Sequence, residues 1–175
     1  RQPDQFKNVT NGIDHRRWLS QINPKLDALI RECTGSDAYL LHPESISGLE
    51  KYKDDSAVLD RLESIKQENK RRFAGYVARE SGIILNTDAI FDVQVKRLHE
   101  YKRQLLNALC IMDLYLSIKD GTLTDFTPTA FIFGAKAAPG YRRAKAIIHY
   151  VNRIAELINN DPAMEGVMKV VFVQN

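Results

Sequence analysis

The spacing of apolar residues along the chain changes in character at about residue 89. Beyond that point, short apolar runs alternate with helical repeats in the order strand, helix, strand, helix, strand. The predicted strands are residues 89–95, 130–133 and 169–173, and the predicted helices are residues 100–119 and 141–159. Strands that alternate with helices favour right-handed crossovers and a parallel sheet. We therefore expect residues 83–175 to form an α/β βαβαβ unit, which is half of a doubly wound domain.

Both helices of this unit have apolar positions at helical spacing, which predicts the face that each one buries. For the first helix these are Leu105, Leu106, Leu109, Met112 and Tyr115 or Leu116. For the second they are Ala144, Ile147, Ile148, Val151, Ile154 and Ile158.

Residues 1–82 have a different pattern and are predicted to be mainly helical. Pro24 suits the first turn of a helix to about Cys33, and Pro43 opens a second short helix to about Tyr52. A long helix then runs from Asp55-Ser56 to the stop signal Ser81-Gly82. The sequence does not place these helices on the sheet.

Composition narrows the class of protein without naming a function. With 44% hydrophobic residues the chain can bury a core, and a net charge of +3 does not by itself indicate nucleic-acid binding. No apolar run approaches the ~20 residues that span a membrane, and no signal peptide is present. Cys33 and Cys110 are interpreted as buried thiols of a cytoplasmic protein. Because the chain opens without Met and closes on a strand, we expect a piece of a longer protein.

The strongest chemical signal is a cluster of cations between the first strand and the helix that follows it. Five basic residues lie within eight consecutive positions here: Lys96, Arg97, His99, Lys102 and Arg103. In open α/β sheets, ligands lie beyond the carboxyl ends of strands, and a helix N-terminus favours anions. Cations in the first helical turn would oppose the helix dipole, so we expect an anion to occupy this site. The alternative is an exposed basic helix start, paired with Asp92 or Glu100.

Two further segments are weaker candidates. The loop 134–141, Gly-Ala-Lys-Ala-Ala-Pro-Gly-Tyr, follows the second strand, and its small residues would let the backbone approach a ligand closely. It is neither a dinucleotide fingerprint nor a Walker loop, so a tight strand-to-helix turn is an equally good interpretation. Asn11, in a turn signal, suits a sugar hydroxyl but is more typical of a structural turn, and a lone Trp such as Trp18 is usually a core residue.

These motifs together resemble the α-glucan (glycogen, starch, maltodextrin) phosphorylases. The resemblance rests on residues 8–18, 91–104 and 134–141 and on Asn159-Asn-Asp-Pro162, and it covers essentially the whole chain. Residues 93–104 are its most specific part. Asp14-His15 replaces the Thr-Pro of animal members, so the chain looks more like a bacterial enzyme.

The resemblance implies a segment from the C-terminal half of a two-domain GT-B glycosyltransferase, a cytoplasmic homodimer with pyridoxal 5′-phosphate as cofactor. In that family inorganic phosphate cleaves terminal α-1,4-linked glucose from a glucan and releases glucose 1-phosphate. The cofactor acts through its phosphate group, so two phosphates must be held together by cations. Residues 1–82 would then link to the N-terminal domain of the whole protein.

The resemblance also implies a role for individual residues. Arg97 and Lys102 would bind the substrate phosphate and act in catalysis, Lys96 would contact the cofactor phosphate, and Tyr101 would hydrogen-bond glucose or the neighbouring phosphate. Asn11 would contact a glucose hydroxyl, and Trp18 would line the cofactor pocket. A surface that binds purine-like inhibitors in animal members matches His99, Glu100, Ala138, Gly140 and Tyr141.

In the family, the Schiff-base lysine would lie beyond the C-terminus of this chain. The N-terminal domain, which would form the opposite wall of the cleft, would lie before its N-terminus. We therefore expect these 175 residues alone to be inactive. Two other functions stay open: a phosphate- or nucleoside-binding module without catalysis, and a nucleotide-sugar glycosyltransferase that shares the fold. No metal, membrane or nucleic-acid partner is expected.

Overall fold

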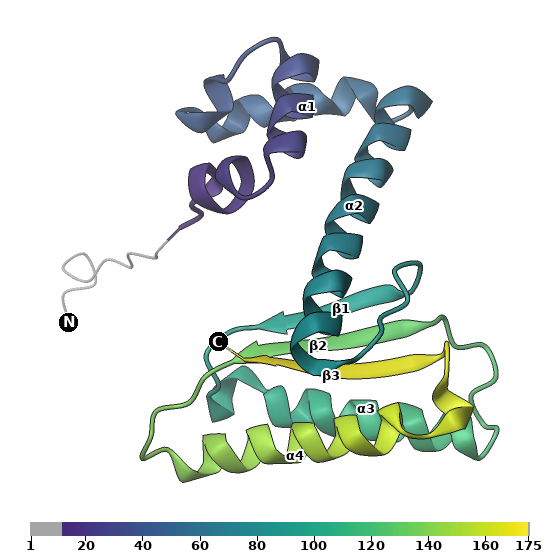
Figure 1. The fold of residues 1–175 in the computed structure, drawn as a ribbon. Coiled ribbons are helices and arrows are strands. Elements are labelled where there is room, and N and C mark those ends of the chain that lie inside the picture. Colours follow the sequence, from purple (N-terminus) through teal and green to yellow (C-terminus); the bar gives the residue numbers. More distant parts are fainter. Residues whose placement is uncertain (1–11, 175) are drawn as a thin grey trace, which may run out of the picture. The chain divides into compact units, whose positions relative to one another are not determined.

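The computed structural model describes residues 12–174, which fall into two compact units that divide between Glu68 and Asn69 (Figure 1). The division lies within the helix α2, Ser56–Ser81. The boundary predicted from the sequence instead lies between residues 82 and 83. Each unit is described by itself below.

The first unit is helical as far as it is described. It contains the π-helix η2 (Arg16–Gln21), the helix α1 (Pro24–Thr34), the 3₁₀ helices η3 (Ala38–Leu40) and η4 (Pro43–Tyr52), and the start of α2. The Asn23 side chain accepts from the Leu26 N–H at 3.4 Å at the start of α1, and Gly35, with φ of 75°, ends it. The buried residues of this unit are Leu29, Ile30, Cys33 and Tyr39.

The second unit contains a three-stranded sheet in the order β1-β2-β3 with both pairs parallel. The strands are β1 (Ile90–Val95), β2 (Thr129–Ala135) and β3 (Met168–Gln174). Neighbouring strands are joined through the helices α3 (Gln104–Lys119) and α4 (Arg142–Asn159). The structure therefore confirms the predicted α/β unit with a parallel sheet.

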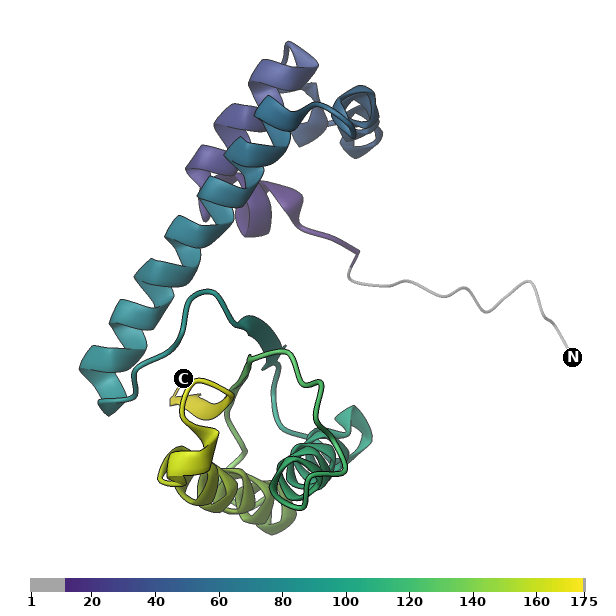
Figure 2. The same cartoon turned by 90° about the vertical axis from the view of Figure 1, so that its right-hand side faces the viewer.

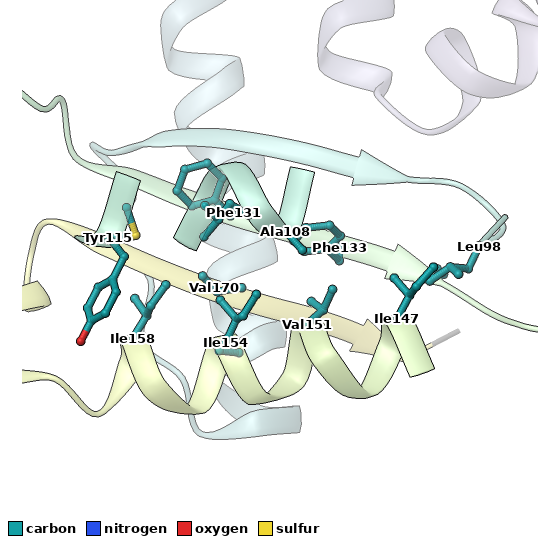
Figure 3. Close-up of a cluster of buried hydrophobic side chains, with 14 of the residues drawn as sticks. Leu98, Ala108, Tyr115, Phe131, Phe133, Ile147, Val151, Ile154, Ile158 and Val170 are labelled. Carbon is teal, nitrogen blue, oxygen red and sulfur yellow. The ribbon is translucent and has the colours of Figure 1, made fainter. Parts of the chain in front are cut away.

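The two faces of the sheet are covered by different elements. The helices α3 and α4 lie side by side on one face (Figures 1 and 2), where Phe131, Phe133 and Val170 of the strands pack among helix residues such as Ile111 and Ile154 (Figure 3). On the other face, Val77 of α2 and Leu85 of the following segment form a buried cluster with two strand residues, Ala130 of β2 and Val171 of β3. Helices on both faces are what a parallel sheet requires, because both of its faces are apolar.

The predicted face of α4 is confirmed in five of its six positions. Ala144, Ile147, Val151, Ile154 and Ile158 are buried, and Ile148 is half-buried against the same core.

The predicted face of α3 is wrong at its leucines, whereas Tyr115 is buried and Met112 is half-buried against the core, as predicted. Leu105, Leu106, Leu109 and Leu116 are between 42% and 59% exposed, whereas Ala108, Ile111 and Tyr115 form the buried stripe. This helix is apolar around most of its circumference, so periodicity alone does not select the buried side. Its Cys110 is also exposed, contrary to prediction, although Cys33 is buried.

Among the described residues, no helix has the length and apolar content needed to cross a membrane.

Candidate functional site

The clustered cations lie on a turn that continues directly from β1; residues 96–103 are called the cation turn. The Lys96 N–H donates to the Gly134 carbonyl at 3.0 Å, and the Leu98 N–H donates to the Lys136 carbonyl at 3.2 Å. These bonds extend the β1–β2 ladder beyond the end of β1. Leu98 is also buried in the core between the sheet and its helices. Because its backbone and its side chain are both held, the chain direction at the neighbouring residue Arg97 is fixed.

The helix predicted from residue 100 begins instead at Gln104. Glu100–Lys102 form a separate 3₁₀ turn, in which the Lys102 and Arg103 N–H groups donate to the carbonyls of His99 and Glu100. Arg103 then adopts φ of 61°, the only positive φ of a non-glycine residue in the described chain. Tyr101 and Lys102 therefore precede α3, and the predicted conflict between Lys102 and the first helical turn does not arise.

A groove of about 560 Å³ lies at the carboxyl ends of β1 and β2, between the cation turn and the loop that follows β2. Residues from both segments line it: Arg97, Leu98, His99, Tyr101, Lys102, Lys136, Ala137, Ala138 and Tyr141. This is the position at which ligands bind in open parallel sheets.

The described lining of the groove contains cations and no carboxylate. Arg97, Lys102 and Lys136 supply the positive charge. Lys102 is half-buried and its Nζ lies 5.7 Å from the centre of the Tyr101 ring, whereas Arg97 and Lys136 are exposed. Such a donor set suits a ligand with two or more negative charges, such as a phosphate group.

Glu100, the one carboxylate of the cation turn, is engaged in hydrogen bonds beside the groove. Glu100 accepts from the Tyr141 hydroxyl at 2.8 Å and from the Arg143 guanidinium at 2.9 Å. These hydrogen bonds, that of Tyr141 first, lower the pKa of Glu100, and the carboxylate raises the pKa of Tyr141 in turn. The pair joins the cation turn to the start of α4 and leaves the charge of the groove uncompensated.

Aromatic rings complete one side of the site. The His99 ring lies 4.4 Å from that of Tyr101 and 5.4 Å from that of Tyr141, centre to centre. The groove therefore combines cations with a cluster of three rings.

A family model described as carbohydrate phosphorylase matches residues 1–175, that is, the whole chain. The chain belongs to the carbohydrate phosphorylase family. It is 47% identical to a glycogen phosphorylase of Bacillus subtilis and 44% identical to the liver form of human glycogen phosphorylase, in both cases over 99% of this chain. It is also 46% identical to glycogen phosphorylase 2 of Dictyostelium discoideum. The chain spans 22%, 20% and 17% of the lengths of these relatives, respectively.

In this phosphorylase-family chain, most of the residues singled out from the sequence lie at one groove. Arg97, His99, Tyr101, Lys102, Ala138 and Tyr141 line it, and Glu100 bonds to Tyr141 beside it. Lys96 is exposed at the start of the cation turn and Gly140 is exposed in the following loop, and neither lines the groove.

The remaining two predicted residues belong to the first unit or to the undescribed part of the chain. Trp18 lies in η2, is 60% exposed, and has the Arg17 guanidinium 4.9 Å from its ring centre, so the core position typical of a lone Trp is wrong here. Asn11 lies outside the described residues. The roles of both residues stay predictions.

Gly134 serves packing within the sheet and not ligand access. A Cβ at this position would lie 3.1 Å from a methyl group of Val95, its partner in the β1–β2 register. The space left by the missing side chain is therefore filled by Val95. At Gly140, in contrast, an added Cβ would have no atom within 4 Å, so a side chain would fit there without a clash.

Sequence reasoning missed three residues of the candidate site. Lys136 adds a third cation, Arg143 holds Glu100, and Gln104 bonds to the backbone of the cation turn. The loop 134–141 was a candidate ligand-binding segment because of its small residues. Its one lysine, Lys136, was the signal that could have identified a further cation of the site. Nothing in the sequence marks Gln104, because a polar residue at the start of a helix is usually exposed.

A larger cavity, of about 860 Å³, lies near the amino ends of β2 and β3. Three of its polar side chains are already paired: Asn159 bonds to the backbone of Val170 through both amide atoms, Asp161 bonds to Lys119 and Tyr115, and Lys169 donates to the Asn159 carbonyl. We therefore regard the cationic groove as the candidate site.

Proposed function

We propose that this chain carries the phosphate-binding part of an α-glucan phosphorylase, a glycosyltransferase that cleaves terminal α-1,4-linked glucose with inorganic phosphate and yields glucose 1-phosphate. In this proposal the chain works within a polypeptide of its relatives' length. The family resemblance supports a GT-B fold, a homodimer and a cytoplasmic location for that protein.

The observation that carries the proposal is the charge of the groove. Three cations line the groove at the carboxyl ends of two parallel strands, and Glu100, the one carboxylate of the cation turn, is bonded to Tyr141 and Arg143. A dianionic phosphate placed there would meet donors without a competing anion. The match of the whole chain to the carbohydrate phosphorylase family makes inorganic phosphate the ligand of choice.

Arg97 and Lys102 would hold the substrate phosphate. Arg97 can offer two parallel N–H donors, whereas Lys102 acts as a point charge. Together they would stabilise the negative charge on phosphate as it approaches the glycosidic bond. Tyr101, which is 70% exposed beside Lys102, would donate to glucose or to the neighbouring phosphate, and Asn11 would contact a glucose hydroxyl.

The donor set also fits the phosphate of pyridoxal 5′-phosphate. Lys96 is an exposed cation next to Arg97, with its backbone fixed to Gly134, so it could hold a second phosphate close to the first. Trp18 would line the pocket of the cofactor ring. When bound, pyridoxal 5′-phosphate supplies a phosphate group that exchanges a proton with the substrate phosphate.

Replacing Arg97 in the complete gene product that contains this chain tests the proposal. We expect Arg97→Ala to lower kcat/KM for phosphate about 100-fold or more, as loss of a donor to transition-state charge does. The absorbance of the bound cofactor should be retained. Phosphorolysis of maltoheptaose, followed as glucose 1-phosphate formed at varied phosphate, is the measurement.

Two further variants make the result specific. Arg97→Lys keeps the charge but loses the bidentate donors, so its activity should fall between wild type and Arg97→Ala. Arg142→Ala removes an exposed arginine that does not line the groove and should leave the kinetics unchanged. Unchanged kinetics in Arg97→Ala would remove this residue from the mechanism. A gene product that binds phosphate without forming glucose 1-phosphate would favour a non-catalytic binding module.

A further inference from the structure

Gln104 is a polar side chain placed where an apolar one would be expected. It is 1% exposed, and among the described residues only Thr129 shares its status as a buried polar residue. Thr129 satisfies its hydroxyl locally, on the carbonyl of Thr127. Burying an amide is costly unless its donors and acceptors are paired, so the partners of Gln104 define its role.

Both ends of the Gln104 amide bond to the cation turn. Its Nε2 donates to the Arg97 carbonyl at 3.2 Å, and its Oε1 accepts from the His99 N–H at 3.5 Å. The amide thus spans the peptide groups on either side of the buried Leu98. It fixes the peptide between Arg97 and Leu98 and the peptide between Leu98 and His99, so it holds the backbone directly after the Cα atom that carries the Arg97 side chain.

A second pair of amides holds the other end of the same turn. Gln94, on β1, donates from Nε2 to the Lys102 carbonyl at 3.5 Å, and its Oε1 accepts from Asn107 Nδ2, on α3, at 2.9 Å. The backbone at Arg97 and the backbone at Lys102 are therefore both tied to side chains of the rigid elements that flank the turn. This matters because Arg103, with φ of 61°, separates the 3₁₀ turn Glu100–Lys102 from the regular hydrogen bonding of α3.

We propose that Gln104 is a positioning residue for phosphate binding: its buried amide sets the backbone of the cation turn so that the Arg97 side chain is presented to the groove. Gln94, held by Asn107, does the same for Lys102. The inference rests on the proposed function, since it assigns Gln104 an effect on phosphate. It accounts for a buried glutamine whose bonds go to the turn and not to the core.

The test uses Gln104→Met in the complete gene product. Methionine fills a similar volume but cannot bond to either peptide group. Losing such bonds should raise KM for phosphate about three- to tenfold, while KM for maltoheptaose stays unchanged. Gln67→Met is the matched control, because Gln67 lies outside the cation turn and, within the part of the chain that the structure describes, its buried Oε1 has no hydrogen-bond partner. It should leave both KM values unchanged.

A double-mutant cycle separates positioning from general stability. If Gln104 acts through Arg97, the effect of Gln104→Met on phosphate should vanish in an Arg97→Ala background. A lowered Tm with unchanged KM for phosphate, or effects that simply add in the double variant, would overturn the inference. Should Gln104→Met fail to fold, Gln94→Met paired with Lys102→Ala gives the same cycle at a half-buried position.

The proposed function and this inference fail in different ways. A wild-type gene product that forms no glucose 1-phosphate overturns both. An active wild type in which Arg97→Ala loses activity, but Gln104→Met and Gln94→Met both keep wild-type affinity for phosphate, overturns the positioning role alone.

Discussion

At the scale of single residues, Asp161 is the acidic group of the described chain whose pKa is lowered most by its surroundings. Its carboxylate accepts from Lys119 Nζ at 2.7 Å, from the Tyr115 hydroxyl at 2.8 Å and from the Ala163 N–H at 3.0 Å. The bond from Lys119, followed by that from Tyr115, lowers the pKa of Asp161 from 3.8 to about 2. The residue joins the end of α3 to the segment between α4 and β3.

This lowered pKa predicts a pH dependence of stability. A carboxyl group whose pKa is lower in the folded state stabilises the fold above its unfolded pKa, and that contribution is lost as the pH falls through the folded value. We expect the contribution of Asp161 to be complete above about pH 4 and lost on approach to pH 2. Urea denaturation of this chain at pH 6, 4 and 2 should show Asp161→Asn less stable than wild type at pH 6.

The difference between the two proteins should shrink toward pH 2, where the wild-type carboxyl is itself becoming protonated. Asp113→Asn, at an exposed position on α3, is the matched control and should follow wild type throughout. A constant difference between Asp161→Asn and wild type across this range would show that titration of Asp161 is not its cause.

Residues with a distinctive charge were predictable, and buried amides were not. Arg97 and Lys102 drew attention because cations are unusual ahead of a helix. Gln104 and Gln94, in contrast, are of a residue type that is usually exposed to solvent, so the sequence does not mark them. Both bond to backbone groups of the cation turn, which ends at the positive φ of Arg103, a conformation that no local sequence rule for arginine predicts.

At the scale of elements, α4 and α3 show when periodicity is sufficient. The apolar residues of α4 form one stripe with charged residues opposite, so only one side of the helix can face the core. In α3, leucines and other apolar residues surround the helix, and the sheet selects the stripe with Ala108 and Ile111 because a small residue lets the helix approach closely. The start of α3 was also mispredicted, since the separate 3₁₀ turn Glu100–Lys102 continues the helical spacing.

A pair of substitutions on α3 tests which side of the helix stabilises this chain. Ile111 is 1% exposed and Leu116 is 54% exposed. Ile111→Ala should lower the free energy of unfolding by about 2–5 kcal/mol, through lost burial and the cavity left behind. Leu116→Ala should change it by no more than about 0.5 kcal/mol. Urea denaturation of the 175-residue chain measures both.

Leu116 is the matched control for Ile111, because both side chains are apolar, have the same number of carbon atoms and belong to the same helix. Equal losses for the two variants would mean that the leucine side of α3 is also buried in solution. The sequence-predicted face would then describe the chain better than the structure does.

At the scale of the whole molecule, the parallel sheet was predictable because alternation of strands and helices permits few topologies. The helical character of the first unit followed from its proline and glycine positions in the same way. The groove itself was predictable only as a place, the carboxyl ends of the strands. The residues that line it come from two segments that are separate in the sequence. Local patterns did not predict that Lys136 would line the groove or that Arg143 would bond to Glu100.

The isolated chain should not catalyse phosphorolysis. Two segments of one sheet edge line the groove, and two of its three cations, Arg97 and Lys136, are exposed to solvent. Ion pairs in water are worth little, and glycosyl transfer to phosphate requires that water be excluded from the reacting groups. We expect the purified 175-residue chain to form no measurable glucose 1-phosphate from maltoheptaose and phosphate. Phosphorolysis by this chain alone would contradict the proposal that it supplies only the phosphate-binding part of the active site.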